Sequence, residues 1–162
     1  MEDIVIDTNV LMHASNPQEA LSGAARQLIH LLLNGTTKIV VDEGFSSDEA
    51  KNQSAIGREY LDKIRHGSIA FALIIQLVSE HRITSVKKSA GHKHKKIICQ
   101  MVRKPVDRIF LSVACNSQER VLVSHDFEDF SEPKRAVFRR VLKIAILRAD
   151  NVLHFDFGQK VN

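Results

Sequence analysis

The sequence predicts an α/β fold, in which helices cover both faces of a central parallel sheet. Short apolar runs rich in β-branched residues alternate with longer segments of helical periodicity. Such runs are typical of strands buried on both faces, and parallel strands need crossover helices between them. Right-handed crossovers place those helices on both faces. No linker, internal repeat or low-complexity tract divides the 162 residues, so we expect a single domain, 1–162.

Five apolar runs are predicted to be strands. The clearest are 3–6, 38–41 and 120–124, because each is short and apolar and is followed at once by polar residues. The run 83–86 predicts a short edge strand, and 152–155 predicts the last strand.

Helical spacing of apolar residues predicts helices between these strands. The first covers 18–33, after a turn at Asn16 and Pro17, and ends at Asn34 and Gly35. The segment 68–80 is apolar nearly all round, and its length and alanine content favour a helix. The other helices are expected over 55–65, after a loop within 87–104, from Pro105 to Asn116, and from Pro133 to Arg148.

Positive charge is concentrated in one segment. Residues 81–110 carry nine Lys or Arg against one acid, whereas the remainder has 14 basic and 18 acidic residues. A basic stretch in an otherwise acidic chain indicates a polyanionic partner, although a solvated charged loop is the alternative. Within it, the residues expected to bind nucleic acid are Lys87, Lys88, Lys93, Lys95, Lys96, Arg103 and Lys104.

Several classes of protein are excluded by composition and motif. Two cysteines, Cys99 and Cys115, do not make a disulfide framework, and His92, His94 and Cys99 fit no standard zinc site. The sequence contains no phosphate-binding glycine-rich loop and no dinucleotide fingerprint. No signal peptide is expected, and no apolar run reaches about 18 residues. We therefore expect a cytoplasmic protein without a membrane span.

Acidic residues follow the predicted strands. Asp7 follows the first strand, Asp42 and Glu43 follow the second, and Asp126 follows the strand at 120–124. Asp107 lies in the first turn of the helix that leads into that strand. Sites gather at the carboxyl ends of parallel strands, so several carboxylates are expected in one cleft. Carboxylates so gathered need a cation between them, and oxygen ligands suit Mg²⁺ or Mn²⁺.

Each acid taken alone has an ordinary structural explanation. Asp7, Thr8 and Asn9 are residue types that cap turns, and Asp107 is favourable in the first turn of any helix. Asp126 and Asp129 are equally compatible with an exposed loop. The joint occurrence of these acids at element ends points to a phosphodiester-hydrolysing metal site. Ser124 and Thr8 are candidates to orient a carboxylate or the attacking water, whereas His125 is expected at the surface.

Three segments, in this order, resemble the motifs of the PIN-domain nucleases: 4–11, 107–114 and 121–130. They read Ile-Val-Ile-Asp-Thr-Asn-Val-Leu, Asp-Arg-Ile-Phe-Leu-Ser-Val-Ala and Val-Leu-Val-Ser-His-Asp-Phe-Glu-Asp-Phe. The resemblance spans nearly the whole chain. It implies a Rossmann-like three-layer fold and cleavage of RNA with Mg²⁺ or Mn²⁺ held by three or four acids.

The resemblance also assigns roles to single residues. Asp7, Asp107 and Asp126 match the family's metal-binding acids, with Asp129 as a further contributor and Asn9 as the polar residue that supports the first acid. The family places a Glu on the helix after the second strand. Glu59 fits that helix, and Glu43 and Glu49 are its competitors.

The predicted activity is therefore a metal-dependent endoribonuclease, a hydrolase of the toxin or RNA-processing type, acting with one or two metal ions. The resemblance implies RNA, an antitoxin-like protein inhibitor and a second copy of the chain as partners. Because the second acid is ambiguous, a catalytically degenerate RNA-binding or scaffold module is the alternative. Structure-specific DNA cleavage is a third reading, for which 162 residues leave little room for an additional DNA-binding element.

Overall fold

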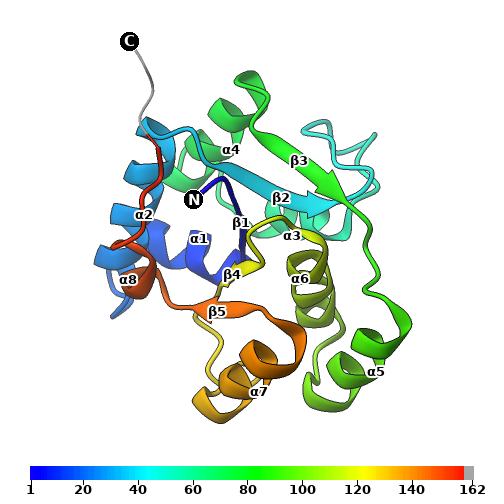
Figure 1. The fold of residues 1–162 in the computed structure, drawn as a ribbon. Helices are drawn as coiled ribbons and strands as arrows, with labels where there is room; N and C mark the ends of the chain where they lie inside the picture. The colour runs from blue at the N-terminus through cyan, green and yellow to red at the C-terminus, as the bar shows by residue number, and fades with distance from the viewer. Residues whose placement is uncertain (159–162) are drawn as a thin grey trace.

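The computed structural model describes residues 1–158, and these contain a five-stranded sheet in which every strand is parallel to its neighbours (Figure 1). The order across the sheet is β3-β2-β1-β4-β5. This confirms the predicted α/β class with a central parallel sheet and helices on both faces. The strands are β1 (Asp3–Ile6), β2 (Lys38–Asp42), β3 (Ile83–Val86), β4 (Val121–Val123) and β5 (Ala145–Leu147).

The helices form the two outer layers. Helices α1, α2 and α4 contact one another, whereas α6 contacts β1, β2 and β4 and is flanked by α3 and α5. Helix α7 packs against β5, and α8 packs against α2 (Figure 1). Their bounds are α1 (Thr8–Ser15), α2 (Ser22–Asn34), α3 (Ala55–Lys63), α4 (Ile69–Ser79), α5 (His92–Met101), α6 (Pro105–Asn116), α7 (Glu132–Leu142) and α8 (Ala149–Val152).

The central strands form the core. Ile4, Val5 and Ile6 of β1 are fully buried, as are Leu122 and Val123 of β4. Side chains of neighbouring strand residues point to opposite faces, so full burial at consecutive positions means that both faces are covered. Apolar runs of this kind were the signal for these strands in the sequence.

The strand order changes direction between β1 and β4. The chain first runs outwards from β1 to β2 and β3, then crosses back to β4 and continues to β5. In register, Val5 pairs with Leu122 and Ile6 with Val123, so the carboxyl ends of β1 and β4 lie side by side. Open α/β sheets bind ligands outside the carboxyl ends of the strands at such a reversal.

Helix α1 lies where no helix was predicted, and α2 begins at Ser22 instead of at residue 18. The side chain of Asp7 accepts a hydrogen bond from the Asn9 backbone N–H and so caps the N-terminus of α1. Val10, Leu11 and Ala14 then face the core. A capping Asp at the end of a strand starts this helix without a linker.

The C-terminal prediction was wrong in two places. Helix α7 ends at Leu142, where Lys143 adopts a left-handed conformation with φ 59°, and residues predicted to extend the helix to 148 form β5 instead. The apolar residues of 144–147 fit a helix and a strand equally well, and pairing with β4 decides between them. The strand predicted over 152–155 is replaced by α8 and a turn.

The remaining elements follow the predictions within one to a few residues at their ends. The edge strand β3, the nearly all-apolar α4 and the proline-initiated α6 lie as expected. None of the helices within residues 1–158 has the length and hydropathy needed to cross a membrane.

Candidate functional site

Asp7 joins the two central strands of the sheet. It follows β1, and its Oδ2 accepts hydrogen bonds from Ser124 Oγ (2.6 Å) and Asn9 Nδ2 (2.9 Å). Its Oδ1 accepts the Asn9 backbone N–H at 3.3 Å. Ser124 directly follows β4, so one carboxylate is held from both strand ends. Asn9 and Ser124 thus contact the acid that they were predicted to support.

The loop after β4 is folded around the same network. Ser124 Oγ accepts the Asp126 backbone N–H at 3.0 Å, and Asn9 Oδ1 accepts the His125 N–H at 3.1 Å. Asp126 Oδ1 in turn accepts the backbone N–H groups of Glu128 (2.9 Å) and Asp129 (2.8 Å). These bonds fix the Asp126 carboxylate close to Asp7.

Asp107 reaches the site from α6, on the face of the sheet opposite to α1. It lies in the first turn of α6, after Pro105, and is 5% exposed. Asp129 is fully buried and accepts the backbone N–H groups of Arg103 (3.1 Å) and Lys104 (2.9 Å), which ties the N-terminus of α6 to the loop after β4. Both oxygens of Asp129 are therefore used to position the helix that carries Asp107.

The ammonium of Lys104 lies between two of these carboxylates. Its Nζ donates a hydrogen bond to Asp126 Oδ2 and lies 3.8 Å from Asp107 Oδ2. Asp107 Oδ2 itself is buried and has no hydrogen-bond partner among the residues that the structure describes. Thr8 Oγ1 is the other buried side-chain atom without a hydrogen-bond partner in the described residues, and buried polar atoms are nearly always paired.

Burial and mutual repulsion set the protonation of the cluster. Burial raises the pKa of Asp7 to about 6, and the charge of Asp126 adds to the rise. Burial also raises the pKa of Asp107 to about 7, with a further contribution from the charge of Asp7. Two carboxylates with raised pKa values beside each other are typical of functional sites.

The other two acids shift in the opposite direction. Burial acts to raise the pKa of Asp126, but the hydrogen bond from Lys104 and the backbone N–H groups lower it below its ordinary value. The pKa of Asp129 is also lowered despite burial, because it accepts the N–H groups of Lys104 and Arg103 and a hydrogen bond from the Asp107 carboxyl. The cluster therefore separates into ionised and partly protonated members.

The candidates for a second acid lie apart from this network. Glu59 forms an ion pair with Lys63 at 2.7 Å, and within residues 1–158 no hydrogen bond or ion pair joins it to Asp7 or Asp107. Glu43 accepts the backbone N–H of Lys88, and Glu49 is exposed in the loop before α3.

Asp42, at the end of β2, accepts hydrogen bonds at the N-terminus of α3. It is fully buried and accepts hydrogen bonds from Ser54 Oγ (2.5 Å) and from the backbone N–H groups of Ala55 (2.7 Å) and Ile56 (2.9 Å). These bonds fix the N-terminus of α3, so we assign Asp42 a structural role.

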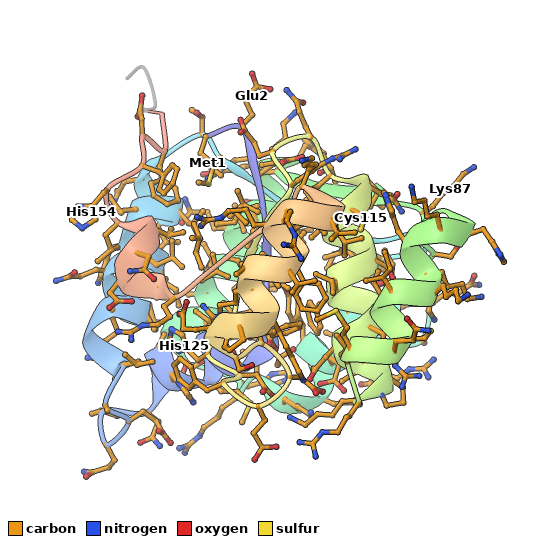
Figure 2. The ribbon with its side chains drawn as sticks, turned by 60° about the horizontal axis from the view of Figure 1, so that its bottom comes forward. Met1, Glu2, Lys87, Cys115, His125 and His154 are labelled. Atoms are coloured by element: carbon orange, nitrogen blue, oxygen red, sulfur yellow. The ribbon has the colours of Figure 1, made fainter. Side chains whose placement is uncertain are left out.

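The residues predicted to bind nucleic acid are all exposed, and we call them the basic surface: Lys87, Lys88, Lys93, Lys95, Lys96, Arg103 and Lys104. Arg82, in the same segment, is buried and donates to the carbonyls of Leu32 and Thr37. The basic surface runs along α5 and reaches the acidic cluster through Arg103 and Lys104, since Lys104 contacts Asp126 and Arg103 Nε lies 3.7 Å from Asp129 Oδ1. Lys87 projects outwards at the side of α5 (Figure 2).

Two features near the site were not predicted. His125 is buried, contrary to the expected surface position, and its Nδ1 lies 2.9 Å from His13 Nδ1. Burial lowers the pKa of His125 to about 4, and its Nε2 accepts the Ala149 N–H at 3.3 Å. The hydroxyl of Tyr60 donates to the Ile6 carbonyl at 2.5 Å, directly before Asp7. Neither contact has a local sequence signal, because the partners come from distant segments.

A cavity at the opposite edge of the sheet does not contain these acids. It measures about 620 Å³ and is lined by residues at the starts of β1 and β2, among them Met1, Glu2 and Lys38. Figure 2 shows Met1 and Glu2 at the end of the molecule opposite to His125. The acids converge at the carboxyl ends of β1 and β4, and we place the candidate site there.

The donor atoms of the cluster suit a hard divalent cation. Asp7, Asp107 and Asp126 offer carboxylate oxygens, and Asp107 Oδ2 is orphaned. Within residues 1–158, however, no three His, Cys, Asp or Glu side chains already form a group that could hold a metal ion. Lys104 Nζ lies between Asp107 and Asp126 instead. Comparisons of the chain with protein-family models, curated proteins and solved structures found no match.

Proposed function

We propose that this protein is a metal-dependent endoribonuclease with its active site at the carboxyl ends of β1 and β4. The observation that carries the proposal is the convergence of Asp7, Asp107 and Asp126 on one sheet edge, where the buried Oδ2 of Asp107 has no hydrogen-bond partner within residues 1–158. Carboxylates that repel one another are costly to bury unless a cation joins them. The raised pKa values of Asp7 and Asp107 express that cost.

Asp7, Asp107 and Asp126 are the residues that would hold Mg²⁺ or Mn²⁺. When bound, such an ion lowers the pKa of a water molecule and neutralises charge on the attacked phosphate. Asp129 is better suited to positioning than to metal ligation, since both its oxygens accept backbone N–H groups. No contact supports Glu59 as a further ligand, because its carboxylate pairs with Lys63.

The surrounding residues would keep the site preorganised. Ser124 Oγ and Asn9 Nδ2 orient the Asp7 carboxylate, and the backbone N–H groups of the loop after β4 orient Asp126. Asp129 holds the first turn of α6, so Asp107 enters the site from a fixed backbone. Positions fixed in this way cost little reorganisation during the reaction.

RNA is the proposed substrate because of the basic surface beside the acids and the resemblance to PIN-domain nucleases. Lysines along α5 would hold the phosphate backbone with little regard to sequence. The basic surface ends at Arg103 and Lys104. A strand of RNA bound along this surface would therefore pass directly over Asp107 and Asp126. We propose single-stranded RNA, whose phosphates can reach a recessed site more readily than those of a duplex.

One observation favours a second candidate, an RNA-binding module without catalysis. The helix expected to supply a further acid carries Glu59, which pairs with Lys63, and Asp62, which is exposed. In this candidate the chain would bind RNA on the basic surface while the acidic cluster holds no catalytic metal.

Cleavage of single-stranded RNA with Mn²⁺, and with a chelator in its place, separates the two candidates. We expect metal-dependent cleavage that is lost in Asp7→Asn and Asp107→Asn, while Asp62→Asn, an exposed acid of α3, keeps wild-type activity. Asn retains the shape of Asp and caps helices equally well, so the variants should fold. Cleavage that survives both substitutions would rule out the proposed site, and RNA binding without any cleavage would favour the second candidate.

A further inference from the structure

Lys104 is held at two different points along its length. Its backbone N–H donates to the fully buried Asp129, and Pro105 follows it as the first residue of α6, so the main chain is fixed. Its side chain, in contrast, is 51% exposed, although the ammonium contacts Asp126 and lies 3.8 Å from Asp107. The backbone is thus anchored while the charged end can move into solvent.

The ammonium lies beside two carboxylates of the cluster. It donates to Asp126 and faces Asp107 Oδ2 at 3.8 Å, so one positive charge lies between two of the acids. The other cations near the cluster face Asp129 and not Asp126 or Asp107. Arg103 pairs with Glu128 at 2.8 Å and its Nε lies 3.7 Å from Asp129 Oδ1, and Lys134 lies 3.6 Å from the same oxygen.

We propose that Lys104 is a built-in counter-ion of the acidic cluster, which a divalent metal ion displaces from Asp126 and which then binds a phosphate of the substrate. This inference rests on the proposed function. Two cations cannot share the carboxylates of Asp126 and Asp107 without repulsion, so binding of the metal carries the cost of breaking the Lys104 contact. Lys104 therefore lowers the affinity of the site for metal. In the metal-free protein its charge reduces the repulsion between the carboxylates of Asp107 and Asp126.

The released side chain keeps its anchor at the N-terminus of α6. Its ammonium is then a free donor at the inner end of the basic surface, within one side-chain length of the acids. A lysine ammonium is a mobile point charge that pairs well with phosphate oxygens. The same residue thus has opposite effects on two steps: it weakens metal binding and strengthens substrate binding.

Calorimetric titration of Mn²⁺ into the metal-free protein tests this inference independently of catalysis. At one fixed pH above the pKa of Asp107, Lys104→Met should bind Mn²⁺ about tenfold more tightly than the wild type, because one charge-assisted hydrogen bond no longer competes. Lys134→Met removes the same charge from a lysine at the edge of the cluster and should stay within about twofold of the wild type. Lys104→Arg keeps the charge and should also resemble the wild type.

Lys104→Met should have the opposite effect on the reaction with substrate. With Mn²⁺ at saturation, Lys104→Met should lower kcat/KM for single-stranded RNA by about tenfold, because one phosphate contact is lost. Equal Mn²⁺ affinities of Lys104→Met and Lys134→Met would overturn the inference, even if the wild type cleaves RNA. Tighter Mn²⁺ binding by Lys104→Met without RNA cleavage by either protein would support the counter-ion role and contradict the proposed activity. Absence of Mn²⁺ binding in all variants would overturn both.

Discussion

Ser124 Oγ donates a hydrogen bond of 2.6 Å to Asp7 Oδ2, across 117 positions of the sequence. The two residues directly follow β1 and β4, the neighbouring strands between which the sheet order reverses. The same hydroxyl accepts the Asp126 N–H at 3.0 Å, so one small side chain connects two of the candidate metal ligands.

We therefore predict that Ser124→Ala destabilises the protein by about 2 kcal/mol, because a buried charged acceptor and a backbone donor both lose a partner. The pKa of Asp7 should rise further, since the Ser124 hydrogen bond lowers it. Urea denaturation and NMR titration of the Asp7 carboxyl measure the two effects. Ser112→Ala is the control, because the hydrogen bond that Ser112 Oγ donates goes to the Arg108 carbonyl within α6. Equal destabilisation by both substitutions would contradict the bridging role of Ser124.

A second prediction concerns the pH dependence of the metal-free protein. Burial raises the pKa of Asp107 to about 7 from its ordinary value of 3.8, so the folded state binds this proton more tightly than the unfolded state. The corresponding stabilisation is fully present below the unfolded pKa and is lost as the pH rises through about 7. Asp107→Asn stays neutral at every pH. The free energy of unfolding of Asp107→Asn minus that of the wild type should therefore increase by a few kcal/mol as the pH rises from about 4 to about 7.

The difference between the two proteins is the quantity to measure, because another group acts in the opposite direction. His125 has a pKa lowered to about 4, so its contribution to stability is lost as the pH falls from its ordinary value of 6.5. Both proteins contain His125, and its effect cancels in the difference. Chemical denaturation at a series of pH values, with chelator present, gives the curve. A difference that stays constant with pH would show that Asp107 titrates normally.

The sequence was most informative where local pattern and tertiary structure agree. The strand ending at Asp7 and the helix beginning at Pro105 were predictable, because an apolar run and an N1 proline each determine their own element. For the segment 144–147 the local pattern was ambiguous, and pairing with β4 made it a strand. Neighbouring strands cannot be identified from the segment alone, so this assignment failed.

The candidate site divides in the same way. The order of the sheet brings Asp7 and Asp126 together, and both could be named from their place after a strand. The role of Asp129 could not, because its hydrogen bonds go to the backbone of Arg103 and Lys104, about 25 positions earlier. Lys104 had been assigned to the nucleic-acid surface. Its spacing of three residues from Asp107 was the available signal for its contact with the acids.

Asp42 provides a prediction that separates structural from functional acids. Its carboxylate accepts three hydrogen bonds at the N-terminus of α3. Asp42→Ala should lower the free energy of unfolding by about 3 kcal/mol, because buried donors are left unpaired. Asp48 also accepts a backbone N–H, from Ala50, but is exposed, so Asp48→Ala should cost less than about 1 kcal/mol. Thermal or urea denaturation decides, and similar losses for both variants would refute the assignment.

The last prediction concerns the lysines of α5. Lys93, Lys95 and Lys96 are exposed, and their simultaneous substitution by Gln should weaken binding of single-stranded RNA whatever its sequence. If all three contact phosphates, the slope of log affinity against log salt should become shallower by about 2, since each contact to a single strand contributes about 0.7. Fluorescence anisotropy over a range of salt concentrations, with chelator present to prevent cleavage, measures this slope. The matched control replaces Lys38, Lys51 and Lys63, which lie outside the basic segment, and changes the net charge equally. If the two triple variants shift the slope by the same amount, total charge rather than the α5 surface governs binding, and the proposed path of the RNA along this helix is wrong.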